Sequence, residues 1–100
     1  MTATLAERVA VGAALLDATT PGWPSRIDTN RLDVRNCYDC VLGQLEGSYW
    51  NGLRKHAGGI ADVAWGIERG FEAAGRGEWE ALNEAWRVLV RERQAERAAR

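Results

Sequence analysis

NCYDCVLGQLEGSYWNGL, residues 36–53, is the stretch that decides how this chain folds. Asn36 is a good helix N-cap, and Asp39 can reach back to the backbone N–H of Asn36. At about 100° per residue, one helix face carries the bulky side chains Tyr38, Leu42, Leu45, Tyr49 and Leu53. The opposite face carries the small residues Cys40, Gly43, Gly47 and Asn51. The pattern predicts a helix over residues 37–55, packed on two sides and central in the fold or in a dimer.

Two glycines, Gly43 and Gly47, lie inside this predicted helix. Each lowers helix stability by about 1 kcal/mol relative to alanine, so another feature should offset that cost. Close approach of a second backbone to the smooth face would do so. A homodimer through this helix, or through the last helix of the chain, is one form of such packing. The alternative is that the two glycines are tolerated without a packing partner.

Three further segments carry apolar residues at helical spacing. The first has Leu5, Val9, Gly12, Ala13 and Leu16; the next has Ile60, Val63, Ile67 and Phe71; the last has Trp79, Leu82, Trp86, Leu89 and Val90. We therefore expect an all-α fold in a single domain over residues 1–100, a compact bundle of about four helices at roughly 3–18, 37–55, 60–70 and 78–95. Residues 91–100 lack an apolar stripe and are expected to form a polar helix end that frays.

The segment between the first two predicted helices begins with Pro21, which disfavours continuation of the first helix. Trp23 is expected to tuck onto the core. Three apolar residues are expected to be buried anchors: Ile27, Leu32 and Val34. Arg31 is flanked by Asp28 and Asp33, which predicts a local ion-pair cluster. Such a cluster contributes little to stability when it is exposed.

Composition narrows the class of protein. Apolar residues make up 46% of the chain and charged residues 27%, which is ordinary for a soluble globular domain. The net charge of −1 argues against non-specific nucleic-acid binding, which depends on a basic surface. No apolar run approaches the roughly 20 residues that span a bilayer, and the N-terminus lacks the pattern of a signal peptide. We expect a cytoplasmic protein with no membrane segment.

Cys37 and Cys40 form the only chemically suggestive motif, a Cys-x-x-Cys pair at the start of the predicted central helix. A thiol there would have its thiolate favoured by the helix dipole. A redox role normally needs a strand before the helix, and the sequence shows no β–α–β pattern. Zinc needs four ligands, and His56 brings the count only to three, so a zinc shared between two chains is the geometric option. The alternative is a structural pair in which Cys40 fills a tight gap.

Tryptophan is abundant, with five residues in 100: Trp23, Trp50, Trp65, Trp79 and Trp86. A small core cannot hide five indole rings completely, and tryptophan concentrates at protein interfaces. We expect most of them to be packing residues and some to mark a protein-binding surface. The candidate surface comprises Gly43, Gly47, Trp50, Trp79 and Trp86.

Two nearby stretches form a distinctive pattern: residues 27–33, IDTNRLD, and residues 40–49, CVLGQLEGSY, followed by Gly52 and Leu53. This part of the chain resembles a small protein family from actinobacteria and their phages. The family pattern is approximately I-D-x-x-x-L-D followed by C-V-L-G-Q-L-x-G-x-Y-x-x-G-L, and the match covers about a quarter of the chain. No activity is assigned to that family, so the resemblance implies a lineage and a compact domain rather than a reaction.

Catalytic groups are scarce in this sequence. It has one histidine and neither a G-x-S-x-G motif nor a phosphate-binding glycine loop. The leading hypothesis is a small non-enzymatic interaction module that binds an unidentified protein, as a phage or prophage accessory protein. One alternative is a zinc-binding or redox protein that uses Cys37 and Cys40. Another is a DNA-binding regulator in which the helices predicted at 37–55 and 60–70 mimic a helix-turn-helix, although neither carries the basic face that this would need.

Overall fold

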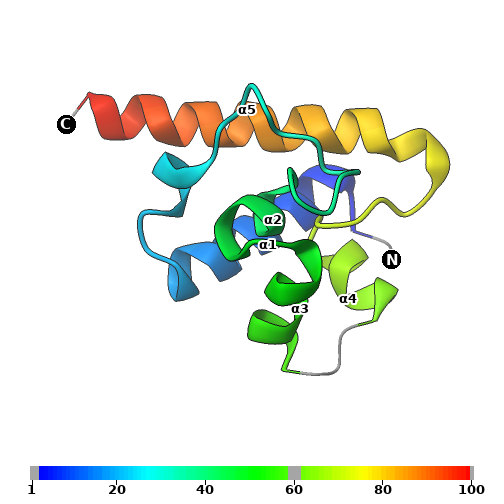
Figure 1. Cartoon of the computed structure of the whole chain (residues 1–100). Helices are drawn as coiled ribbons and strands as arrows, with labels where there is room; N and C mark the ends of the chain where they lie inside the picture. The colour runs from blue at the N-terminus through cyan, green and yellow to red at the C-terminus, as the bar shows by residue number, and fades with distance from the viewer. Residues whose placement is uncertain (1–2, 59–61, 100) are drawn as a thin grey trace.

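The computed structural model describes residues 3–58 and 62–99. Within them the chain is all-α, as predicted, but it forms five α-helices rather than about four (Figure 1). These are α1 Leu5–Thr19, α2 Val41–Glu46, α3 Tyr49–Ala57, α4 Val63–Glu68 and α5 Trp79–Ala98, with short 3-10 helices η1 Trp23–Arg26 and η2 Arg76–Glu78. The radius of gyration, 12.6 Å, is that of a compact domain of this length.

The longest helix, α5, extends along one side of the molecule, and α2, α3 and α4 lie together on one side of it (Figure 1). The loop after η1 crosses α5 and is tied to it by hydrogen bonds. Asn83 accepts from the N–H of Val34 at 2.8 Å, and Arg87 donates to the carbonyl of Leu32 at 3.2 Å. α1 packs against both α4 and α5. Sequence-distant helices therefore enclose one core.

The core centres on aromatic rings from three segments. Trp86 is fully buried, stacks on Phe71 with 5.6 Å between ring centroids, and meets Trp23 edge-on at 6.1 Å. Its indole N–H donates to the carbonyl of Gly70 at 2.6 Å, so the buried polar atom is satisfied. The Trp23 indole is also fully buried and donates to Asp17 at 2.9 Å. The expectation that Trp23 tucks onto the core is confirmed.

The segment before α2 contains both a correct and an incorrect prediction. The three expected anchors are buried: Ile27, Leu32 and Val34. The ion-pair partner of Arg31 differs from the prediction, because its Nε lies 2.8 Å from Asp39. Asp28 and Asp33 instead accept backbone N–H groups in local turns. Short acidic side chains often bond nearby backbone in this way.

The predicted continuous helix over 37–55 is wrong at its start. Asn36 does not cap a helix there; its side chain accepts the N–H groups of Tyr38 and Asp39 and closes a turn. The helix begins at Val41, and Cys40 is its N-cap, with Sγ accepting the N–H of Gly43 at 3.2 Å. Because Tyr38 lies in the turn and not on the helix, its side chain is 62% exposed instead of buried.

The same predicted helix is broken again in its middle. Gly47 ends α2 with a φ of +93°, a conformation that L side chains rarely adopt. Ser48 then caps α3 by accepting the N–H of Asn51 at 3.1 Å. The remaining residues of the predicted bulky face are buried: Leu42, Leu45, Tyr49 and Leu53. These four residues of the predicted apolar face are therefore buried as expected, but two short helices carry them rather than one continuous helix.

The other predicted helices differ mainly in length. α4 covers only part of the predicted 60–70, and Ile60 lies outside the described residues. α5 continues to Ala98, and Gln94 donates to the carbonyls of Pro24 and Ile27 at 2.9 Å each. These bonds tie the first part of the expected polar tail to η1.

A buried arginine joins α1 to the segment between α4 and α5. Arg8 on α1 is buried and donates to the carbonyl of Ile67 at 2.9 Å and to the carboxylate of Glu78 at 3.0 Å. The Glu78 carboxylate also accepts the N–H of Ala74. These bonds hold the segment between α4 and α5 against α1, and with it the first residue of α5, Trp79.

Candidate binding cleft

The cysteine pair adopts a structural arrangement. Cys40 is buried, and its Sγ both caps α2 and lies 3.8 Å from the carbonyl of Cys37. Burial raises the pKa of the Cys40 thiol to about 11, so the group is protonated at neutral pH and is a poor nucleophile or metal ligand. Cys37 is half-buried and free. In residues 3–58 and 62–99, no three His, Cys, Asp or Glu side chains are placed to hold a metal ion.

Cys37 instead lines a surface cleft with a volume of about 230 Å³. We call it the aromatic cleft, and its walls come from the turn before α2, from α3, from the segment after α4 and from the start of α5. Its lining residues are Val34, Arg35, Cys37, Tyr49, Trp50, Phe71, Glu72 and Trp79. The fold thus brings together three residues that the sequence marked as site candidates: Cys37, Trp50 and Trp79.

A tyrosine–glutamate pair lies at the wall of the aromatic cleft. The Tyr49 hydroxyl donates to Oε2 of Glu72 at 3.1 Å. The two side chains can meet because Gly66 leaves the space open; a Cβ there would clash with the Tyr49 hydroxyl. Burial, together with the neighbouring Glu72 charge, raises the pKa of Tyr49 well above its ordinary value. The hydroxyl is therefore a permanent donor to Glu72 near neutral pH.

The aromatic residues offer different surfaces to the cleft. Phe71 stacks with Trp65 at 5.9 Å and with Trp86 at 5.6 Å and is only 4% exposed, so little of its ring is open to a ligand. Trp50 meets Tyr49 edge-on at 5.6 Å and is 62% exposed. The most accessible ring of the cleft is therefore the Trp50 indole, from the first turn of α3.

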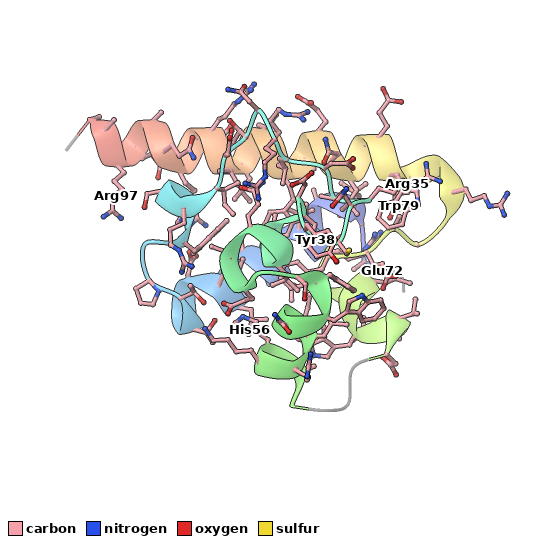
Figure 2. All side chains as sticks on the ribbon, viewed as in Figure 1. Arg35, Tyr38, His56, Glu72, Trp79 and Arg97 are labelled. Atoms are coloured by element: carbon pink, nitrogen blue, oxygen red, sulfur yellow. The ribbon has the colours of Figure 1, made fainter. Side chains whose placement is uncertain are left out.

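Trp79 and two charged residues also line the cleft. Trp79 is half-buried at the start of α5, and Arg35 lies beside it (Figure 2). Arg35 is exposed and Glu72 is half-buried. Within the described parts of the chain, neither residue makes an ion pair. Among the described residues, therefore, the cleft is lined by one carboxylate and one guanidinium that have no ion-pair partner.

Of the five residues in the predicted interaction surface, Trp50 and Trp79 line the aromatic cleft, whereas Gly43, Gly47 and Trp86 do not. Trp86 is fully buried in the core. Gly43 is buried, and a Cβ there would lie 2.5 Å from the carbonyl oxygen of Cys37. The backbone that approaches Gly43 closely is therefore the preceding turn of the same chain, so a second chain is not needed to explain this glycine. Gly47 is exposed, but its positive φ ends α2.

A second hollow lies between the turn after α1 and the end of α5, with a volume of about 420 Å³. Asp17 at its wall is already paired with Arg93 at 2.8 Å, and this guanidinium lowers the pKa of Asp17. Its tryptophan, Trp23, is fully buried and leaves no exposed indole surface. The aromatic cleft is the better candidate site, because it combines exposed indole area with a half-buried carboxylate, Glu72, that makes no ion pair to any described residue.

No protein-family model, curated protein or solved structure significantly matches this chain. The resemblance to an actinobacterial and phage family therefore stays a prediction that rests on the quoted motif. Among the helices described, none has the length and apolar character needed to cross a bilayer.

Proposed function

We propose that this protein is a small, non-enzymatic interaction module whose aromatic cleft receives a side chain of a partner polypeptide. The observation that carries the proposal is the 62% exposure of Trp50 beside a cleft that also contains Trp79. Indole rings dominate the free energy of many protein interfaces, because each buries a large apolar area at low entropic cost. An exposed indole at a cleft is therefore a surface suited to binding.

The volume of the cleft favours one side chain over a free small molecule. Typical ligand pockets measure roughly 300–1,000 Å³, and the aromatic cleft is smaller, at about 230 Å³. A single anchoring residue from a peptide or a protein surface fits that size. The rest of the partner would then pack on the exposed surface around the cleft.

The thiol-based alternative has less support. Cys40 is held in its protonated form by burial and is engaged as a helix cap. A redox or zinc function would require that cap to open, which would remove the hydrogen bond to Gly43. The DNA-binding alternative rests on the helices predicted at 37–55 and 60–70, and neither has a basic face in its sequence. A cytoplasmic location and a phage or prophage origin remain parts of the proposal that rest on the sequence.

The proposal can be tested by selection from a random dodecapeptide display library on the immobilised protein. Peptides selected on the wild-type protein should bind the Trp50→Ala variant at least tenfold more weakly than they bind wild type. The matched control is Val88→Ala, which removes another exposed apolar side chain, 45% exposed on α5 and not among the residues lining the cleft. Binding that is equal on all three proteins, or no enrichment on wild type, would overturn the proposal.

A further inference from the structure

We infer that the anchor received by the aromatic cleft is the cationic side chain of a lysine or arginine in the partner polypeptide. The inference deepens the proposed function and rests on it. It starts from the charge of Glu72, the one carboxylate among the residues that line the cleft. Within the described part of the chain no basic side chain pairs with it.

The carboxylate of Glu72 is only partly satisfied by the protein. Oε2 accepts the Tyr49 hydroxyl, and the described residues offer no hydrogen-bond donor to Oε1. A partly buried carboxylate loses hydration when a ligand covers it, and that loss is costly unless the ligand supplies a donor. An ammonium or guanidinium group supplies both donor hydrogens and opposite charge.

The rest of the cleft suits the aliphatic part of such a side chain. Lysine and arginine bury their methylene stems along apolar surfaces while the charged end reaches a polar group. Trp50 and Trp79 both provide indole surface to the cleft. The same rings attract cations through their π-faces, with tryptophan the strongest of the aromatic side chains. A wholly apolar anchor would use the indoles but would leave the Glu72 carboxylate covered and uncompensated.

Arg35 is the one cation at the cleft, and its position limits its influence. Its side chain is exposed at the rim, where water and salt screen its charge, whereas Glu72 lies half-buried in the wall. Arg35 therefore weakens binding of a cationic anchor slightly rather than preventing it. Replacing it with a neutral residue should strengthen binding by about two- to threefold, consistent with the small contributions of exposed charges.

The first readout is the sequence of the peptides selected on wild type. Peptides whose binding depends on Trp50 should share a lysine or arginine at one aligned position. A shared leucine or phenylalanine there, with no basic residue, would overturn the inference while leaving the proposed function intact. Failure to obtain any Trp50-dependent peptide would overturn both. Self-association of wild type that Trp50→Ala abolishes would identify a second copy of the chain as the occupant and would also overturn the inference.

The second readout is a double-mutant cycle on one selected peptide. Replacing its basic residue with norleucine removes the charge and keeps an unbranched aliphatic stem; Glu72→Gln removes the carboxylate but keeps an acceptor for the Tyr49 hydroxyl. Each change alone should weaken binding by about tenfold, as expected for a charge-assisted hydrogen bond. Both together should cost little more than either one.

Two controls accompany this cycle. Glu92→Gln removes an exposed carboxylate from a part of α5 outside the cleft and should leave the dissociation constant unchanged. Arg35→Gln should strengthen binding of the basic peptide and not of its norleucine form. The comparison of the basic and norleucine peptides uses only the wild-type protein. It therefore tests the inference even if the Glu72→Gln variant does not fold. Equal affinity of wild type for the basic and norleucine peptides would overturn it.

Discussion

Trp86 and Trp50 are both tryptophans, but one lies in the buried core and the other on the exposed surface. Trp86 lies in the interior between α5 and the segment after α4, is fully buried, and makes a satisfied hydrogen bond to Gly70. Trp50 lies on the surface of α3 and is 62% exposed, and its indole N–H makes no hydrogen bond to a described residue, unlike those of Trp23 and Trp86. The first indole stabilises the fold, and the second leaves apolar area free for a ligand.

The two regions also differ in how they are held together. The core is enclosed by the two longest helices, α1 with 15 residues and α5 with 20. The wall of the cleft that carries Trp50 belongs to α3, which has 9 residues and follows the 6-residue α2. Isolated helices of that length are marginal in water, so α2 and α3 depend on capping and on packing against the core. The cleft therefore requires the core, whereas the core does not require the exposed side chains of the cleft.

Of the substitutions that test this contrast between core and cleft, Trp86→Ala should cause the largest loss of stability. The change removes the contacts of the Trp86 indole with Phe71 and Trp23 and leaves a cavity in the core. We expect a loss of about 3–5 kcal/mol in the free energy of unfolding, a large share of the stability of a small domain. Chemical denaturation followed by circular dichroism measures it. A loss below about 1 kcal/mol would show that Trp86 is not the centre of the core.

Gly43→Ala should have the next largest effect, because it forces apart the turn and the helix on which the cleft is built. The new Cβ would lie 2.5 Å from the carbonyl oxygen of Cys37 and 2.7 Å from that of Tyr38, and both are backbone atoms that cannot rotate away. Overpacking of this kind costs about 1–3 kcal/mol. The matched control is Gly77→Ala, where no atom lies within 4 Å of the added Cβ. Equal stability of the two variants would contradict the close approach.

The all-α class and the buried anchors could be predicted because they depend on local apolar spacing, which survives in any tertiary context. The break at Gly47 could have been predicted as well, since glycine followed by serine combines a favoured helix end with a favoured N-cap. The helical spacing of apolar residues continues across Gly47, so periodicity alone predicted one continuous helix there. Trp86 also carried a local sign of burial, because it shares its helix face with Leu82 and Val90, both fully buried.

The composition of the cleft was less predictable. Trp50 and Trp79 were candidates because tryptophan is abundant, but nothing near Glu72 in the sequence marks it as part of a site. It reaches the cleft through a hydrogen bond to Tyr49, 23 residues earlier, and through the space left by Gly66. Such contacts arise from tertiary packing, and local spacing carries no information about them.

A smaller effect, confined to acidic pH, should come from His56 at the end of α3. Its side chain is only 2% exposed, with Nδ1 3.5 Å from the Thr19 hydroxyl and Nε2 3.8 Å from the Glu46 carboxylate. Burial lowers the pKa of His56 despite Glu46, and the nearby Lys55 charge lowers it further. The unfolded chain therefore binds a proton more readily than the folded one. Stability from this group is present above the ordinary histidine pKa of about 6.5 and is lost as pH falls below it.

Denaturation of wild type and His56→Gln between pH 8 and 5.5 measures this contribution. The difference in unfolding free energy between the two proteins should shift in favour of the variant as pH falls, since glutamine does not titrate. A difference that is constant with pH, or one that moves the other way, would show that the folded protein holds His56 at or above its ordinary pKa.

The smallest effect on stability, and the most informative, should come from Trp50→Ala. A side chain that is 62% exposed in the native state has little apolar area to lose on truncation, and its edge contact with Tyr49 is its only aromatic one in the described chain. Surface substitutions of this kind usually change the free energy of unfolding by no more than about 0.5 kcal/mol. Peptide binding should nevertheless fall at least tenfold, because the same indole would be buried in the complex. If Trp50→Ala lowered both stability and affinity, Trp50 would be a packing residue like Trp86. The proposed difference between the core and the cleft would then be wrong.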